Sequence, residues 1–306
     1  MLDRLGFVAS VLSGGITTSR TCRLANATPL RLRELTAQNL ASLDQVVTFL
    51  EKNDIRLYRI SSNIIPFASH PVNTIRWWEE FAPDFRYLGK RLRSLGVRVS
   101  THPGQYTVLN SPTPSIVTAA VAELVYQARL LDALGADRSC KIVVHGGGLY
   151  GATEEVALAR FIDRARDLPK EVLDRLVIEN DDRLFDAEEV LGVSRALGIP
   201  VVFDWLHHTA NPCRRPIRTV LKEVFATWGE ADGPPKIHMS SQAADAPSGA
   251  HADYVLLDDV LAFLRVAPRL RFDCMLEAKE KDRALLRLRE ELRTAGVLPG
   301  LTSAGA

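Results

Sequence analysis

The 306-residue chain has few cysteines and almost no excess of charge. Its four cysteines stand at positions 22, 140, 213 and 274, and none belongs to a CxxC pair. That is far from a disulfide framework, so we predict reduced thiols in a cytoplasmic protein. Lys and Arg number 38 against 37 Asp and Glu, a net charge of +1 with neutral histidine. A broadly polybasic nucleic-acid binder is excluded, whereas a local basic groove or a site that grips phosphate through metal ions is not.

Long apolar runs and nucleotide-binding motifs are also missing. The longest uncharged stretch, residues 99–122, contains Pro103, Pro112 and Pro114, which a membrane-spanning helix would not carry together. No GxGxxG follows the first apolar run, and glycines 146–148 lack a following Lys-Ser/Thr. We therefore expect no nucleotide cofactor and no membrane partner. The short apolar run at the N-terminus lacks a clear positive n-region and predicts a core strand rather than a signal peptide.

What the chain does contain is a regular alternation of short strands and helices. Eight runs rich in Val, Ile, Leu and Phe are too short for helices and predict strands at 5–9, 55–60, 97–101, 141–145, 176–179, 200–204, 236–239 and 272–277. Helices are predicted at 33–52, 73–94, 112–134, 154–167, 187–197, 216–228, 254–266 and 279–295. Strict alternation predicts a parallel sheet. Eight units fit a single-domain (β/α)8 TIM barrel over residues 1–297 with a frayed tail at 298–306, and an open doubly wound sheet is the alternative.

Local signals mark where several of these helices begin and end. Asp186 and Glu189 have the spacing of a capping box, and Ser111 before Pro112 predicts a helix that begins with proline. Glycine follows three helices, at positions 96, 135 and 198, where a left-handed residue would end each helix.

Histidines and acids gather where the predicted strands end. They are His102, His145, Glu179, Asp204 and Glu277 at five strand ends, Lys236 and His238 on the seventh strand, and His70, His207 and His251 in loops after strands. In a TIM barrel the chemistry lies at these carboxyl ends. Residues two apart on a strand share a face, so Lys236 and His238 can both point into the barrel mouth.

Taken singly, each of these residues is more often a satisfied polar group or a helix cap than a ligand. Jointly, buried carboxylates among histidines are costly unless cations neutralise them. Nine N/O ligands on one rim are too many for one ion and predict two or three divalent metals that share carboxylates. The set contains no cysteine, which argues against a structural zinc knot, and suits Zn²⁺, Mn²⁺, Fe²⁺ or Co²⁺.

The ordered motifs resemble those of the UV damage endonuclease family (UVDE), ATP-independent DNA repair nucleases similar in fold and metal arrangement to endonuclease IV. The resemblance spans nearly the whole chain through LGFV, YRISSNIIPFASHP, THPGQY, IENDD, FDWLHHTANP, PKIHMSS, SGAHADYV and EAKEKDRALLRL. It implies metal ligation by His70, His102, His145, Glu179, Asp204, His207, His238, His251 and Glu277, with Glu179 as a bridge. Lys236 matches a metal-site lysine that can be carboxylated. We expect Glu179 and Lys236 to be catalytic, with two or three ions, Mn²⁺ first and Zn²⁺, Co²⁺ or Mg²⁺ as alternatives.

The resemblance also implies a substrate, damaged double-stranded DNA. Gln105 and Tyr106 match a pair that inserts into the duplex at the lesion, where wedge insertion costs a few kcal/mol and less if the DNA is already damaged. Phe7 and Val11 stand where some members carry Tyr and Asn. Stacking of Phe7 on DNA is therefore expected, without hydrogen bonding from this side.

The reaction implied is metal-assisted hydrolysis of the phosphodiester immediately 5′ to a cyclobutane pyrimidine dimer or 6-4 photoproduct. It would leave a 3′-hydroxyl and a 5′-phosphate. Three alternatives stay open: an abasic-site endonuclease of the endonuclease IV type, a metal-dependent sugar isomerase of the same barrel class, and a non-catalytic damage-recognition protein.

Overall fold

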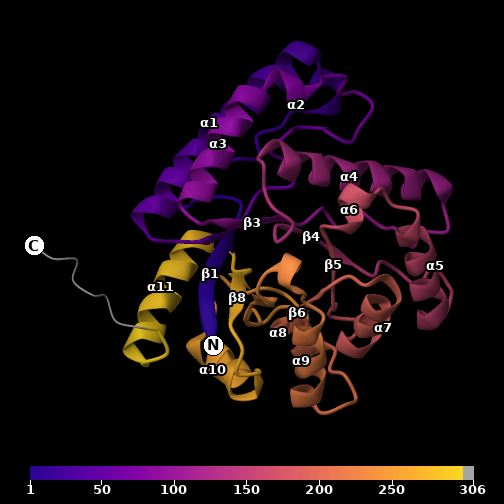
Figure 1. The fold of residues 1–306 in the computed structure, drawn as a ribbon, viewed down its shortest axis with the longest axis vertical. Helices are drawn as coiled ribbons and strands as arrows, with labels where there is room; N and C mark the ends of the chain where they lie inside the picture. Colours follow the sequence, from indigo (N-terminus) through magenta and orange to yellow (C-terminus); the bar gives the residue numbers. More distant parts are fainter. Residues whose placement is uncertain (299–306) are drawn as a thin grey trace, which may run out of the picture.

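The computed structural model describes residues 1–298, and eight parallel strands within them close into a barrel (Figure 1). In barrel order they are β1 (Leu2–Val8), β2 (Leu57–Arg59), β3 (Arg98–Thr101), β4 (Lys141–His145), β5 (Leu176–Glu179), β6 (Val201–Asp204), β7 (Lys236–Met239) and β8 (Phe272–Leu276). Because β1 pairs with both β2 and β8, the sheet has no free edge. The predicted TIM barrel is confirmed and the open sheet is excluded. Residues 299–306 of the predicted tail lie outside the described residues.

Helices surround the strands on the outside of the barrel (Figure 1). They are α1 (Pro29–Lys52), α2 (Trp77–Glu80), α3 (Ala82–Ser94), α4 (Pro114–Ala133), α5 (Glu154–Arg166), α6 (Lys170–Leu173), α7 (Ala187–Leu197), α8 (Trp205–Ala210), α9 (Ile217–Ala226), α10 (Leu257–Val266) and α11 (Lys281–Thr294), with 3-10 turns at Leu24–Asn26 and Glu230–Asp232. The helix predicted at 73–94 divides into α2 and α3 at Phe81, since Pro83 has no N–H with which to continue α2. The sequence patterns do not indicate the two short helices α6 and α8.

The boundary signals are confirmed at all but one of these positions. The Asp186 carboxylate accepts from the Glu189 amide, and the Glu189 carboxylate accepts from the Asp186 amide, a complete capping box. Glycines 96, 135 and 198 have φ of 63°, 61° and 68°. The prediction that a helix begins at Pro112 is wrong, because Pro114 takes the first helical turn of α4 and the Ser111 hydroxyl instead accepts from the Thr113 amide at 3.2 Å.

The N-terminal apolar run is a barrel strand, as predicted. It begins earlier than expected, at Leu2, because the backbone already pairs there with Phe272 of β8. Within residues 1–298 there is no helix long and apolar enough to cross a membrane. All four cysteines are free.

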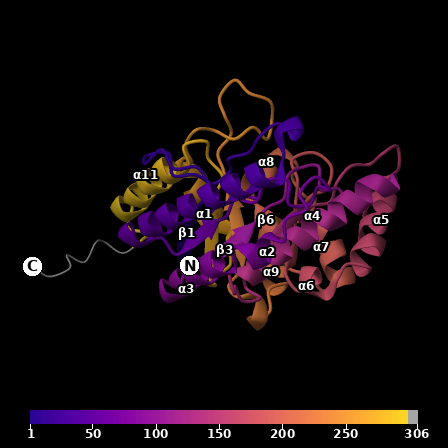
Figure 2. The ribbon, with the colours of Figure 1, turned by 90° about the horizontal axis from the view of Figure 1, so that it is seen from above.

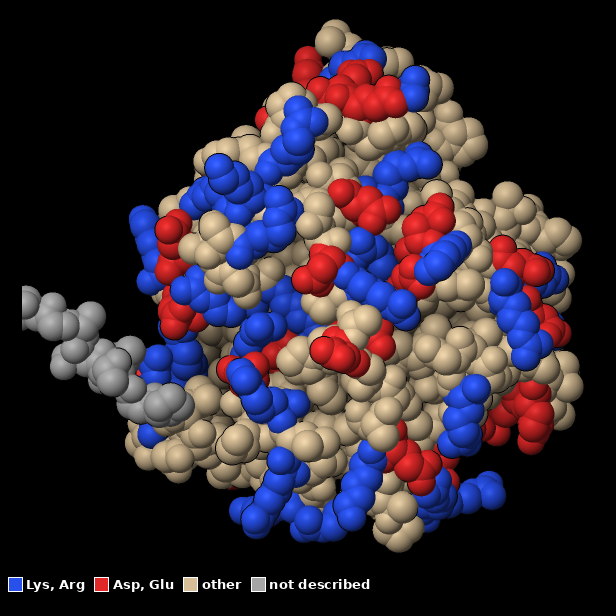
Figure 3. All heavy atoms as spheres, viewed as in Figure 1, with Lys and Arg blue, Asp and Glu red and all other residues tan. Residues whose placement is uncertain are grey.

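Buried ion pairs and valines fill the interior of the barrel at its lower end, where the strands begin. The Arg98 guanidinium lies 2.8 Å from Asp273, and the Lys141 ammonium lies 2.5 Å from Asp232. These pairs satisfy charges that would be costly alone. Above them Val143, Val177 and Val202 form a small apolar cluster with Trp228. The barrel is therefore a packed core whose upper end carries the site. On the face drawn in Figure 3, charges of both signs intermingle.

Candidate metal centre and DNA-binding rim

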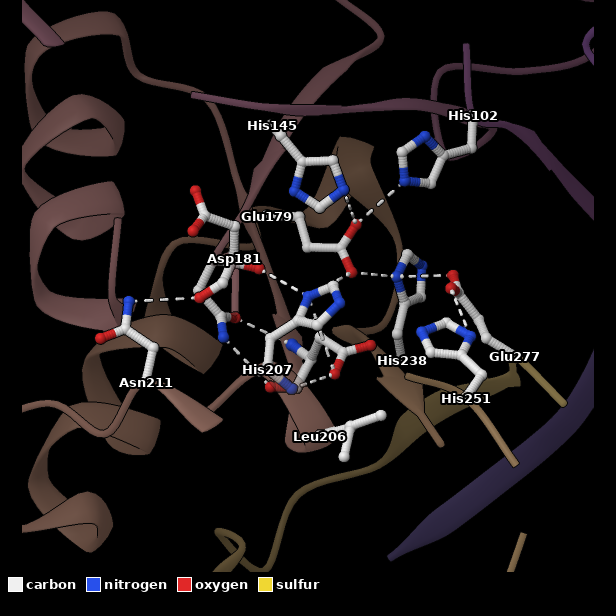
Figure 4. A network of polar contacts seen from close by, with 12 residues as sticks. His102, His145, Glu179, Asp181, Leu206, His207, Asn211, His238, His251 and Glu277 are labelled. Carbon is white, nitrogen blue, oxygen red and sulfur yellow. Dashed lines mark hydrogen bonds and ion pairs between the residues drawn. The ribbon is translucent and has the colours of Figure 1, made fainter. Parts of the chain in front are cut away.

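Glu179, the last residue of β5, lies at the centre of a histidine cluster (Figure 4). Its Oε2 is 3.1 Å from Nε2 of His102 and 3.6 Å from Nε2 of His145. The other oxygen, Oε1, accepts from Nδ1 of His238 at 2.6 Å and lies 3.8 Å from Nδ1 of His207. One buried carboxylate is therefore shared by four imidazoles, one directly after β3 and the others on β4, β7 and α8.

The cluster contains three groups of three potential ligands, and Glu179 belongs to each of them. Within a group all ligand atoms lie within 4.8 Å of one another; the groups are Glu179 with His102 and His145, Glu179 with His238 and Glu277, and Glu179 with Asp204 and His207. Such a geometry lets one carboxylate serve several cations. The structure thus brings seven of the nine predicted ligands into three adjoining groups.

Asp204 ends β6 and also caps the helix that follows it. Its Oδ1 accepts from the His207 amide at 2.8 Å, so the first turn of α8 brings the His207 ring back to the Asp204 carboxylate. Its Oδ2 is buried, with no hydrogen-bond partner among residues 1–298. An unpartnered carboxylate oxygen in the interior is costly unless a cation lies beside it. The residues present therefore fit a divalent metal.

The pKa shifts of the clustered residues also fit a bound divalent metal. Burial raises the pKa of Asp204, and the negative charges of Glu179 and Glu277 add to the effect, although His207 opposes it. Burial lowers the pKa of His207, but Asp204 and Glu179 outweigh that and hold it at about 9. For His102, burial lowers the pKa to about 4, so its ring is neutral at pH 7 and able to bind a metal. Asp204 therefore carries a buried charge that its neighbours do not fully offset, and a divalent ion would offset it.

β7 brings Lys236 and His238 to the same side of the barrel, as the two-residue spacing predicts. Both side chains are buried, Lys236 being 1% exposed. Burial lowers the pKa of Lys236 well below its usual range, and the positive charges of Arg98 and Arg59 add to the effect. Lys236 therefore lies inside the barrel, in surroundings that favour the neutral form of its amine.

Arg59, at the end of β2, is a site residue that sequence reasoning missed. It is 8% exposed, donates to Nε2 of His238 at 2.6 Å, and lies 2.5 Å from Oε1 of Glu277. Burial raises the pKa of Glu277, but Arg59 and His238 more than reverse this and hold it well below its usual range. A charged residue directly before ISSN at a strand end was the signal available.

The two remaining predicted ligands lie further out. Nδ1 of His251 is 3.9 Å from Oε2 of Glu277, at the margin of the cluster. His70 is exposed, its Nδ1 accepts from the Val72 amide at 3.0 Å, and its ring meets the edge of Phe67. Across the described chain no hydrogen bond or ion pair joins His70 to the other predicted ligands. The structure brings His251 to the edge of the site and leaves His70 outside it.

Gln105 and Tyr106 lie in the loop between β3 and α4, a few residues beyond His102. Both are exposed, and the Tyr106 side chain is 84% exposed. Gln105 and His102 line one small cleft together with Gly147 of the next loop. An amide and an aromatic ring are therefore presented to solvent directly beside the histidine cluster.

The expectation that Phe7 stacks on DNA is corrected by its position. Phe7 pairs in register with Tyr58, whereas Val8 pairs with Arg59, whose side chain enters the barrel. Strand alternation therefore turns Phe7 outward. Its ring is fully buried, 5.4 Å from Tyr58 and 6.0 Å from Phe49 of α1. Phe7 is a core residue beneath α1, and Val11 is buried as well.

Comparison with known proteins places this geometry in a family. The family model described as UV-endonuclease UvdE matches residues 3–301. A UV DNA damage endonuclease of Bacillus cereus (strain Q1) is 37% identical over 264 residues, which cover 86% of this chain and 83% of that protein. The crystal structure of SacUVDE superimposes with a TM-score of 0.89 at 33% identity and covers 96% of this chain and 99% of that one. Endonuclease IV from Thermus thermophilus, at 19% identity and TM-score 0.59 over 95% and 100% of the two chains, shares the fold.

The barrel, the clustered N/O ligands and these relatives define a metal-dependent DNA endonuclease, a hydrolase that depends on divalent metal and binds DNA as its substrate. Within that class the chain belongs to the UV-endonuclease UvdE family and is a UV-damage repair endonuclease.

Proposed function

We propose that the enzyme incises double-stranded DNA immediately 5′ to cyclobutane pyrimidine dimers and 6-4 photoproducts, and leaves a 3′-hydroxyl and a 5′-phosphate. The observation that carries this proposal is the sharing of Glu179 among three ligand groups, next to the exposed pair Gln105 and Tyr106. The residues proposed to hold the metal ions and those proposed to contact distorted DNA therefore lie on the same rim of the barrel.

The proposed ligands for two or three divalent ions, Mn²⁺ foremost, are the seven clustered residues together with His251 and His70. His70 would join them only after leaving the Val72 amide. When bound, such ions would activate water at neutral pH and offset the charge of the phosphate and of the leaving oxygen. The protein's own part is to hold carboxylates and imidazoles in place. Asp204 holds His207 through its helix cap, and Arg59 holds Glu277 through an ion pair.

We propose that Lys236 is carboxylated in the native enzyme. A neutral amine adds to carbon dioxide by forming an N–C bond and releasing one proton, which converts a base into an acid. The direction of the pKa shift supports this proposal, because carbon dioxide adds only to the neutral form of the amine and burial favours that form. Intact mass measured without acid should show the added CO₂ in the native enzyme and its loss in Lys236→Arg.

Gln105 and Tyr106 are proposed to fill the space left when damaged bases leave the stack. A planar amide and an aromatic ring can pack against neighbouring bases, and insertion costs less where the duplex is already distorted. Recognition would then depend on the deformability of the DNA rather than on its base sequence.

The test is to map the cut on an end-labelled duplex with one cyclobutane dimer at a known position. We expect one cut directly 5′ to the dimer, with ends that a ligase-dependent assay identifies as 3′-hydroxyl and 5′-phosphate. A matched duplex with an abasic site separates this activity from that of a plain abasic-site nuclease. Cleavage of the abasic duplex alone would overturn the proposed substrate.

A further inference from the structure

The loop between β4 and α5 holds an exposed tyrosine in an unusual backbone conformation. Tyr150 has φ of 54°, in the left-handed region that glycine adopts without cost and an L residue such as tyrosine does not. Its side chain is 46% exposed, so packing in the core does not explain the residue. Gly148 and Gly151 flank it, yet the costly position carries an aromatic ring.

Neighbouring residues fix this loop on both sides of Tyr150. The fully buried Asn110 side chain donates to the carbonyl of Gly148 at 2.8 Å and accepts from the Gly148 amide at 3.2 Å. On the other side, Arg160 of α5 donates to the carbonyl of Leu149 at 2.9 Å, and its guanidinium lies 6.0 Å from the centre of the Tyr150 ring. The loop therefore holds an exposed ring in a defined place.

The loop belongs to the same rim as the metal centre. It begins directly after His145, whose ring lies beside Glu179. Asn110, which clamps it, comes from the loop that carries Tyr106, and the two loops line one cleft. A third loop of this rim, the orange one between β7 and α10, projects away from the N-terminus in Figure 2. Two exposed tyrosines thus stand on adjacent loops next to the catalytic cluster.

We propose that Tyr150 is a second aromatic contact for DNA, whose ring stacks on a base that has left the helix when the enzyme binds. This rests on the proposed function, because only a distorted duplex offers such a base beside the site. An aromatic ring binds any base through its face and needs no particular sequence. The fixed loop lowers the entropy lost on binding, since the ring is already in position.

Steady-state nicking of a duplex with one cyclobutane dimer tests the role of Tyr150. Tyr150→Asn removes the ring but tolerates the left-handed conformation, so the loop can keep its shape. We expect kcat/KM to fall about tenfold, the usual scale for loss of one stacked base, mainly through KM. The salt dependence of kcat/KM should not change, because no phosphate contact is lost. Tyr150→Phe should behave as wild type.

Tyr87→Ala is the matched control, because Tyr87 of α3 is 54% exposed and lies on an outer helix. Equal kcat/KM for Tyr150→Asn, the Tyr87 control and wild type would overturn the inference, provided that wild type prefers the damaged duplex. Equal losses in Tyr150→Phe and Tyr150→Asn would also overturn it, since the hydroxyl and not ring stacking would then be responsible. If wild type shows no preference for damage, the proposed function itself fails, and that is a different result.

Discussion

Nδ1 of His238 donates to Oε1 of Glu179 at 2.6 Å, while the other oxygen of the same carboxylate faces His102 at 3.1 Å. Burial raises the pKa of Glu179, but the neighbouring imidazoles of His238 and His145 and the hydrogen bonds from His102 and His238 outweigh it and hold the pKa well below its usual range. Glu179 is therefore ionised in the interior, and each of its oxygens is aimed at a different part of the cluster.

Glu179→Gln should abolish nicking, with a loss of more than about 100-fold, and should lower bound metal by more than one ion per chain. The amide keeps the shape but has neither the charge nor two acceptor oxygens for shared cations. Elemental analysis after dialysis and a nicking assay measure both effects. Glu51→Gln on α1, at an exposed ion pair, is the control. Full metal content in the active-site variant would contradict the bridging role.

Asp204→Asn should weaken metal binding without lowering the stability of the metal-free protein. Burial raises the pKa of Asp204, so its charge is costly in the metal-free protein, and asparagine removes this cost while it can still cap α8. We expect the melting temperature of the metal-free protein to be unchanged or a few degrees higher, and the stabilisation by added Mn²⁺ to be mostly lost. Calorimetry with chelator and with Mn²⁺ measures both. An unchanged metal-induced shift would remove Asp204 from the ligand set.

Replacement of Gln105 and Tyr106 by alanine should weaken the preference for damaged DNA rather than the chemistry. Neither side chain belongs to the ligand groups, so bound metal should be normal. We expect the ratio of kcat/KM for damaged over undamaged duplex to fall at least tenfold, the scale for losing one stacked ring. Competition between the two duplexes in one tube measures this ratio directly. A ratio equal to that of wild type would contradict the proposed insertion of Gln105 and Tyr106 into the duplex.

Glu189 should make the fold less stable as the pH rises. Burial raises its pKa to about 7 from an ordinary 4.5, and the nearby carboxylates of Asp186 and Glu154 contribute. Between these two values the folded state holds the proton more tightly than the unfolded state, so the free energy of unfolding falls as pH rises from 4.5 to 7. The partly exposed carboxyl limits this to about 1 kcal/mol. Glu189→Gln should flatten that slope in urea unfolding, and an equally steep slope in the variant would argue against it.

Sequence patterns sufficed for the barrel and for most of the cluster, because carboxyl ends of parallel strands must meet at one rim. Glu179, Asp204 and His238 could be placed together for that reason alone. Phe7 could not be placed correctly, because the side of a strand that faces the barrel depends on register with Tyr58, which the sequence does not display. Arg59 was missed since a charged residue at a strand end looks like a solvated one. The position of His70 depends on a loop conformation rather than on a strand end.

Nicking of supercoiled plasmid, irradiated and unirradiated, with Mn²⁺ and with chelator, measures damage dependence and metal dependence together. We expect conversion of irradiated plasmid to the open circle in Mn²⁺, little conversion of unirradiated plasmid, and none with chelator. Nicking of irradiated DNA that persists in chelator, or the absence of nicking with every divalent ion tried, would contradict a metal-dependent repair endonuclease built around Glu179.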